Sequence, residues 1–245
     1  MQYKFETGST HLLKELRNQV DAYFASQNSN PAGGWRLYLK GLFQVLTAIT
    51  LYIILVFFTP ITPIAILLCV LLGLNFAVIG FNVMHEGGHQ TFSRFGWLNR
   101  IAAYFLNVLG GTIYYWKKKH NINHHTYTNI EGMDSDIDVK PFMRLHEDQP
   151  LKPYHRFQHI YGFFLYGVSY IAWVFYDDFQ KYVSGRITAT SGKNRLPLKQ
   201  HIIFWTTKLS YIGVYMVIPI LMVGWVYWLI GFFIMTFTCG LAISI

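Results

Sequence analysis

Five of the ten histidines in this chain fall into two short clusters. His85 and His89 form the first cluster, and His120, His124 and His125 form the second. On an α-helix, residues four apart share one face, with Cβ atoms about 5–6 Å apart, so each spaced pair can converge on one metal ion. His125 lies about 100° further around such a helix and can serve a second ion. Imidazole ligands suit iron, zinc, copper or nickel, so the clusters predict a transition-metal centre.

The first cluster also has the form of a second kind of metal site. Residues 85–89 read His-Glu-Gly-Gly-His, which satisfies the HExxH pattern of zinc metalloproteases, with Glu86 as the general base. The two glycines, however, weaken the helix on which that pattern normally lies. A protease would also leave the second cluster without a role. The protease is therefore the weaker alternative, and a membrane protein that only binds metal is a third one.

The composition points to a lipid environment. The chain is 53% hydrophobic and 18% aromatic, but only 13% of its 245 residues are charged, about half of the usual share of roughly 25%. The mean hydropathy is +0.28. A soluble core could not bury so many apolar residues. Cys69 and Cys239 lie inside apolar runs, so we expect packing residues and no disulfide framework.

Four apolar runs are long enough to cross a membrane, which takes about 20 residues. They cover residues 39–58, 64–84, 202–222 and 225–245, and short breaks pair them into two hairpins. We expect a polar N-terminal arm (1–38) before a membrane domain (39–245). Two further apolar stretches, 101–116 and 157–176, are expected to be interfacial helices, the first of them alternatively re-entrant. The predicted fold class is an all-α integral membrane protein.

The distribution of basic residues predicts the orientation. Of the 20 Lys and Arg residues, five precede or begin the first hairpin, 14 lie between the hairpins, and Lys208 is the last. By the positive-inside rule, the N-terminus and the histidine-bearing region are then cytoplasmic. The net charge of +8 is explained in this way, so we expect no nucleic-acid partner. Lys208 intrudes into the third span, where we expect its side chain to snorkel to the surface.

The two histidine clusters, with Trp116 before the second one, resemble the boxes of the membrane fatty acid desaturase family. Flanking residues strengthen the likeness: Asn82, the run 127–129 (Tyr-Thr-Asn), and the acidic segment 134–138. The segments 20–24 and 158–161 resemble the bacterial acyl-lipid and linoleoyl-CoA desaturase-like branch. The resemblance extends over nearly the whole chain and implies a multi-pass protein, most simply of a bacterial inner membrane.

The resemblance also implies the chemistry. The expected activity is removal of two hydrogens from an acyl chain by two iron ions that use O2 and two electrons. The five clustered histidines would be the metal ligands. The substrate would be a fatty acyl-CoA or acyl-lipid, and membrane lipid surrounds the site. A separate ferredoxin or cytochrome b-type protein is the expected electron donor, because the 40 residues before the first span cannot hold a haem domain. A di-iron hydroxylase, epoxidase or ketolase shares this architecture and stays an alternative.

Further residues receive roles through the same resemblance. Those expected to orient the ligands are Glu86, Asn129, Asp134, Asp136 and His159, although a solvated loop explains the aspartates equally well. Trp116 and Tyr115 could line the acyl channel or serve only as interface anchors. Lys117, Lys118 and Lys119 could bind the phosphates of a head group or CoA, or only set the topology. The remaining histidines, His11, His146, His155 and His201, are expected at the surface.

One departure from the family concerns the C-terminus. The family has a third histidine box after its last span, and this sequence stops at Ile245. We therefore expect a C-terminally truncated chain that lacks part of its ligand set and is inactive as it stands.

Overall fold

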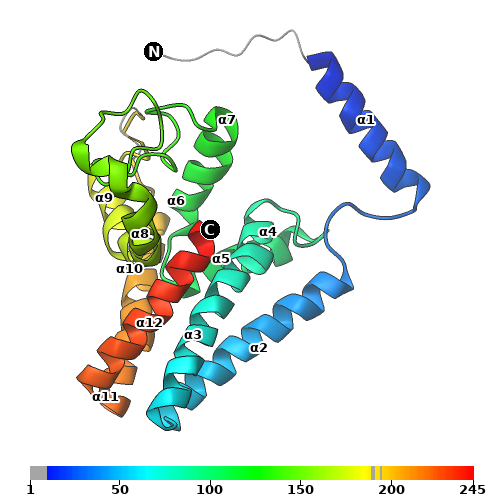
Figure 1. Cartoon of the computed structure of the whole chain (residues 1–245). Helices are drawn as coiled ribbons and strands as arrows, with labels where there is room; N and C mark the ends of the chain where they lie inside the picture. The colour runs from blue at the N-terminus through cyan, green and yellow to red at the C-terminus, as the bar shows by residue number, and fades with distance from the viewer. Residues whose placement is uncertain (1–9, 189–190, 194) are drawn as a thin grey trace.

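The computed structural model describes residues 10–188, 191–193 and 195–245, and all regular secondary structure in these ranges is helical. The helices are α1 (Thr10–Ser26), α2 (Trp35–Phe57), α3 (Thr62–Ile79), α4 (Glu86–Gly88), α5 (Gly96–Val108), α6 (Ile113–Trp116), α7 (His125–Tyr127), α8 (Gln158–Ala172), α9 (Asp178–Ser184), α10 (Leu198–Ile212), α11 (Ile218–Val223) and α12 (Trp225–Ser244). Residues 1–9 of the expected N-terminal arm lie outside the described part. The rest of the arm is mainly α1, which extends away from the other helices (Figure 1).

Short π-helical segments join several of these helices into longer rods. Among the described residues they are Gly80–His85, between α3 and α4; Lys117–His124, between α6 and α7; Trp173–Asp177, between α8 and α9; and Gly213–Val217, between α10 and α11. In a π-helical turn the backbone bonds connect residues five apart, so side chains are rotated relative to an α-helix. Two of the four segments directly precede or contain the clustered histidines.

Four helical runs are long and apolar enough to cross a membrane, which confirms the predicted spans. They are Trp35–Phe57, Thr62–Gly88, Leu198–Val223 and Trp225–Ser244. The first three begin at residues 35, 62 and 198 rather than at 39, 64 and 202. The earlier start of the second span includes Pro63 in the first turn of α3, a position that suits proline. Pro197 directly precedes the third span as the N-cap residue of α10.

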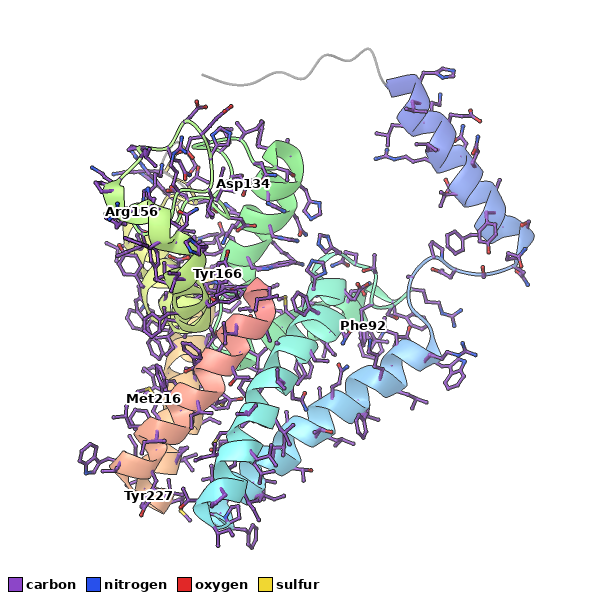
Figure 2. All side chains as sticks on the ribbon, viewed as in Figure 1. Phe92, Asp134, Arg156, Tyr166, Met216 and Tyr227 are labelled. Carbon is purple, nitrogen blue, oxygen red and sulfur yellow. The ribbon has the colours of Figure 1, made fainter. Side chains whose placement is uncertain are left out.

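The four spans place the histidine-bearing segments at one end of the molecule. Figure 1 shows the turns α2–α3 and α11–α12 together at the lower end, α4 at the upper end of the spans, and α7 above it. In Figure 2, Asp134 and Tyr227 mark these opposite ends. α12 packs against both α3 and α8, so the second hairpin is joined directly to the first. The buried core of this junction includes Leu72, Phe76 and Met235.

The apolar stretch 101–116 is not one helix, so the prediction of a single helix was wrong, whereas its interfacial or re-entrant position stays a prediction. α5 ends at Val108, and α6 begins at Ile113 after a turn in which Gly110 has φ +86°. This left-handed conformation ends helices and favours glycine. The stretch 157–176 does lie on a continuous helical run, from α8 to α9, which is absent from the four candidate spans among the described residues. Its place at an interface stays a prediction.

The expected snorkelling of Lys208 was also wrong. The side chain is 3% exposed, and its ammonium donates to Gly110 O and Val174 O at 2.7 Å and to Asp178 Oδ2 at 2.9 Å. A buried ammonium needs partners for its donors. The partners are inside the protein, on the turn before α6 and on the run from α8 to α9.

Candidate metal centre

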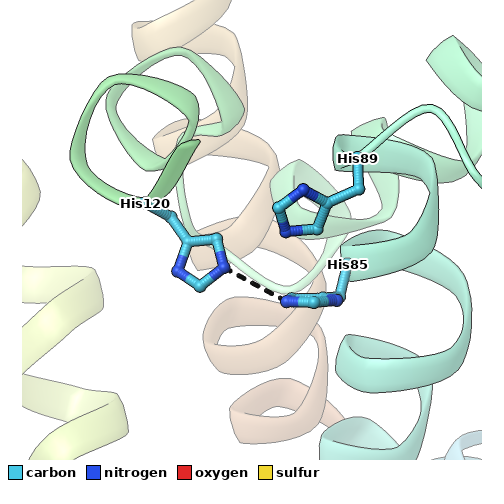
Figure 3. A group of neighbouring side chains, drawn as sticks. All are labelled: His85, His89 and His120. Atoms are coloured by element: carbon cyan, nitrogen blue, oxygen red, sulfur yellow. Dashed lines mark hydrogen bonds between the residues drawn. The ribbon is translucent and has the colours of Figure 1, made fainter. Parts of the chain in front are cut away.

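Three histidines from two distant parts of the chain meet at the upper end of the spans. His85 ends the π-helical segment after α3, His89 follows α4, and His120 lies on the segment after α6. One ring nitrogen of each lies within 4.8 Å of the others. The Nε2 atoms of His85 and His120 are 3.2 Å apart (Figure 3). The structure thus brings the two predicted clusters together in one place.

The π-helical turn changes the expected direction of His125. An α-helix would turn this residue about 100° away from its neighbour His124 and away from His120. In the structure, His125 follows the π-helical segment, and its Nε2 lies 3.2 Å from Nε2 of His120. The α-helical geometry assumed for the second cluster was therefore wrong. His125 faces the same group of imidazoles as His85 and His89.

The donor atoms fit a metal ion. The Nε2 atom of His89 is buried and has no hydrogen-bond partner among the described residues. His120 Nε2 faces Nε2 of both His85 and His125, although one ring nitrogen can share a single proton with only one of them. Buried polar atoms are normally satisfied. Several imidazole nitrogens directed at one small volume, one of them orphaned, are what a transition metal would satisfy.

Two histidines of this group, His89 and His120, are held in the neutral form that binds metal. Burial lowers the pKa of His89, and the neighbouring His85 and His125 add to the effect. Burial and the same neighbours lower the pKa of His120 to about 4. A neutral imidazole is the ligand form, and metal binding at neutral pH then displaces no proton from His120.

A pH dependence of stability follows for the metal-free protein. His120 has an ordinary pKa of 6.5 when unfolded and about 4 when folded. Between these pH values the unfolded chain binds more protons, so the free energy of unfolding falls as the pH is lowered from about 6.5 to about 4. Thermal unfolding in detergent with a chelator should show this slope. The slope should be smaller in His120→Gln, but not zero, because the pKa of His89 is lowered too; an unchanged slope contradicts the assignment.

A second group involves the acidic segment. Ring nitrogens of His120 and His124 and a carboxylate oxygen of Asp136 lie within 4.8 Å of one another. His124 Nδ1 donates to Asp134 Oδ2 at 2.9 Å, and the backbone N–H of Asn129 donates to the same oxygen at 2.9 Å. Asp134 is 1% exposed. A carboxylate on Nδ1 fixes the tautomer that leaves Nε2 for a metal.

Asp134→Asn tests this orientation. The variant keeps the shape of the side chain but removes the nearer of the two carboxylate charges that face His124 Nδ1, that of Asp134 at 2.9 Å and that of Asp136 at 3.3 Å. The expected result is a metal affinity about 10–100-fold lower, measured by titration with Fe²⁺ or Co²⁺. Asp138→Asn is the matched control, because that carboxylate is exposed and its ion pair is with Lys140, at 3.3 Å. Equal affinities in the two variants would remove Asp134 from the site.

The lysines before the second cluster differ from one another. The ammonium of Lys119 pairs with Asp136 at 2.7 Å. Burial alone would lower the pKa of Lys119, but the carboxylate of Asp136 outweighs it, and the net shift is upward. Lys118 lies over the ring of Tyr114, 4.8 Å from its centre. Lys119 is thus tied into the acidic segment, whereas a head-group role for Lys117 and Lys118 stays a prediction.

The two glycines of the first cluster allow close packing. A Cβ on Gly87 would lie 2.5 Å from the backbone nitrogen of Ala103 in α5. A Cβ on Gly88 would lie 2.3 Å from Cζ3 of Trp116. The Trp116 ring stacks on His120, with centres 4.6 Å apart and planes 22° apart. The glycines therefore bring α5 and Trp116 against the histidine-bearing helix.

The other predicted site residues take different positions. Glu86 accepts a hydrogen bond from Thr91 Oγ1 at 2.5 Å, and Tyr115 is buried against Phe204. His159 is exposed on α8. The expectation that His155 is a surface residue was wrong, because it is 7% exposed and its Nε2 donates to Pro141 O at 2.9 Å.

Asn121 is a residue that the sequence interpretation missed. Its Nδ2 donates to Gly88 O at 3.1 Å and so joins the two clusters. Its position inside the second cluster was the available signal.

An apolar cavity of about 520 Å³ lies away from the histidines. Its lining comes from both hairpins near their turns and includes Tyr52, Pro60, Cys69, Tyr215 and Trp228. Trp116 and Tyr115 are not part of this lining. Their role beside an acyl chain stays a prediction.

Comparison with known proteins identifies the class of protein to which the helical architecture and the imidazole clusters of this chain belong. The family model described as fatty acid desaturase matches residues 61–245. The chain belongs to the fatty acid desaturase family.

Three relatives illustrate the similarity. The sn-1 linoleoyl-lipid 6-desaturase of Arthrospira platensis is 33% identical over 62% of this chain and 42% of its own length. The enzyme of the same description from Synechocystis sp. is 34% identical over 66% of this chain and 45% of its own. The acyl-lipid (8-3)-desaturase of Physcomitrium patens is 29% identical over 83% of this chain and 43% of its own length. The chain thus spans about half the length of the curated relatives it matches. No solved structure matches.

Proposed function

We propose that the protein containing this chain is a membrane acyl-lipid desaturase with a histidine-held di-iron centre. The observation that carries the proposal is the convergence of five imidazoles, from two distant segments, at one end of four candidate spans. Membership of the family supports the reaction class. The names of the relatives support an acyl group on a lipid as the substrate.

The proposed reaction converts a –CH2–CH2– unit of the acyl chain into –CH=CH–. The two hydrogens, two external electrons and two protons reduce O2 to two water molecules. Bound iron would supply the oxidant that an unactivated C–H bond requires. The ligands would be His85, His89, His120, His124 and His125. Asp134 would hold the proton on His124 Nδ1, and Trp116 would shield His120 from water through its stacked ring.

The proposed orientation puts the histidines on the cytoplasmic side. It rests on the basic residues, which are absent from both hairpin turns in the sequence, and on the position of these turns at the end opposite the histidines (Figure 1). Electrons would then reach the site from a soluble or membrane-bound donor of the ferredoxin or cytochrome b type.

Product analysis tests the proposal. Cells that express the protein are given saturated and monounsaturated acyl chains, and the double bonds in their lipids are mapped. New double bonds support the desaturase, whereas hydroxylated chains support the related hydroxylase. Metal analysis of the purified protein separates the remaining alternative. About two iron ions per protein molecule agree with the proposal. A single zinc ion per molecule would fit the protease alternative and contradict the proposal.

A further inference from the structure

A buried ion pair lies next to the turn that joins α5 to α6. Lys208 is 3% exposed and Asp178 is 0% exposed, and their charged atoms are 2.9 Å apart. The ammonium of Lys208 also donates to Gly110 O in the turn, at 2.7 Å. Thr112, at the end of the turn, donates from Oγ1 to Asp178 Oδ2 at 2.9 Å. Each member of the pair therefore holds one side of the turn.

Other contacts hold the same turn. Tyr170 on α8 donates its hydroxyl to Leu109 O at 2.5 Å. The ring of Tyr211 on α10 lies so close to Gly110 that a Cβ there would be 2.6 Å from it. Side chains of the run α8–α9 and of α10 thus contact the turn, and the Lys208–Asp178 pair supplies the charged contacts among them.

The position of the turn decides how the two histidine clusters face each other. Before the turn, α5 packs on α4, where Gly87 meets Ala102 and Ala103. After it, α6 leads without a break into the segment that carries His120. A rotation or shift at the turn would therefore move His120 relative to His85 and His89. Ligand geometry is sensitive to shifts of about 0.5 Å.

Stability alone does not explain this pair. Two buried ions lose solvation that their attraction often fails to restore, and apolar residues of similar volume are commonly as stable. In addition, Asp178 Oδ1 is buried without a partner in the described part of the chain. An arrangement selected for stability would leave no such oxygen.

We propose that the Lys208–Asp178 pair is a positioning device that fixes the Gly110–Thr112 turn and thereby the register of His120, His124 and His125 against His85 and His89. The inference rests on the proposed metal centre and adds residues that touch neither metal nor substrate. It explains why an ammonium is retained inside a candidate span.

The test compares stability with metal binding in detergent-solubilised protein. The single variant Asp178→Asn leaves the Lys208 charge unpaired and should lower the melting temperature. The double variant Asp178→Leu with Lys208→Met removes both charges and should recover the melting temperature. The affinity for Co²⁺, followed by its visible absorption, should nevertheless stay about tenfold or more below that of the unmodified protein. A purely structural pair predicts that stability and affinity recover together.

A milder pair of variants covers the case in which the charge variants do not fold. Thr112→Val keeps the ion pair and the Lys208–Gly110 contact but removes the hydrogen bond from the turn to Asp178, and should weaken Co²⁺ binding. Thr236→Val is the matched control, since Thr236 is also fully buried but, among the described residues, donates only to Phe232 O and Phe233 O within α12. If Thr112→Val and the double variant bind Co²⁺ like the unmodified protein, the inference is wrong and the metal centre stands. If His120→Ala binds Co²⁺ as well as the unmodified protein does, the metal centre and the inference both fall.

Discussion

His120→Ala is expected to abolish metal binding and desaturation. His120 is common to both groups of side chains that could hold an ion. Its Nε2 also faces Nε2 of His85 and His125, at 3.2 Å in each case. Loss of a residue that only orients a ligand costs about 10–100-fold in affinity, so loss of the shared ligand should exceed about 100-fold. Iron content and double-bond formation measure the effect.

The control for this prediction is another histidine of the same chain. His11 is exposed on α1, which extends away from the site (Figure 1). His11→Ala should retain the iron content and activity of the unmodified protein. Retained iron in His120→Ala would contradict the central position that the structure gives this residue.

Gly88→Ala is expected to damage the site through packing alone. The added methyl group would lie 2.3 Å from the ring of Trp116, which is 8% exposed and stacks on His120. The ring is rigid and enclosed, so it must move and disturb His120. Overpacking of this kind costs about 1–3 kcal/mol. The melting temperature and the metal affinity should both fall, and both can be measured on one detergent-solubilised sample.

Gly80→Ala is the matched control, eight residues earlier on the same helical run. A Cβ at Gly80 would meet nothing within 4 Å. Alanine is favoured over glycine inside a helix by about 1 kcal/mol, so this variant should be as stable as the unmodified protein or more so. If Gly88→Ala behaves like Gly80→Ala, the packing of Trp116 is not important for the site.

The spans and the histidine clusters were predictable because they depend on composition and spacing. Apolar runs of about 20 residues give the position of a membrane helix directly, and the four predicted spans are all present as helices. The approach of His85 to His120 was predictable because both clusters carry imidazole ligands, and ligands of one metal centre must lie close together. The spacing of the histidines does not specify which of their nitrogen atoms face each other.

The direction of His125 was not predictable from a helical period of 3.6 residues. A π-helical turn has no clear signal in a single sequence, and here it replaces the α-helix between His120 and His125. The role of Gly87 and Gly88 was missed for a related reason. Helix propensity describes an isolated helix, whereas these glycines are needed by neighbours that come from other parts of the chain.

Lys208 and His155 show the limit of reasoning from one segment at a time. Each is a polar residue whose local sequence shows no sign of a buried partner, and each is buried because its partners come from other segments. Asp178 is 30 residues before Lys208 and Gly110 is 98 before it. His155 finds its acceptor on Pro141, 14 residues away. Tertiary contacts of this kind are not contained in local periodicity.

The π-helical segments have a consequence for how helices adhere to each other in lipid. A widened turn interrupts the regular backbone ladder and can offer a carbonyl oxygen to an outside donor. In the segment Trp173–Asp177 the carbonyl of Val174 receives Lys208. In the segment Gly213–Val217 the carbonyl of Val214 receives the hydroxyl of Tyr52, at 2.6 Å, and that of Tyr215 receives the indole of Trp228, at 2.9 Å. Each widened turn thus provides a main-chain acceptor for a neighbouring helix. The Tyr52 and Trp228 contacts each need only one polar side chain in the hydrocarbon, whereas Lys208 also pairs with Asp178.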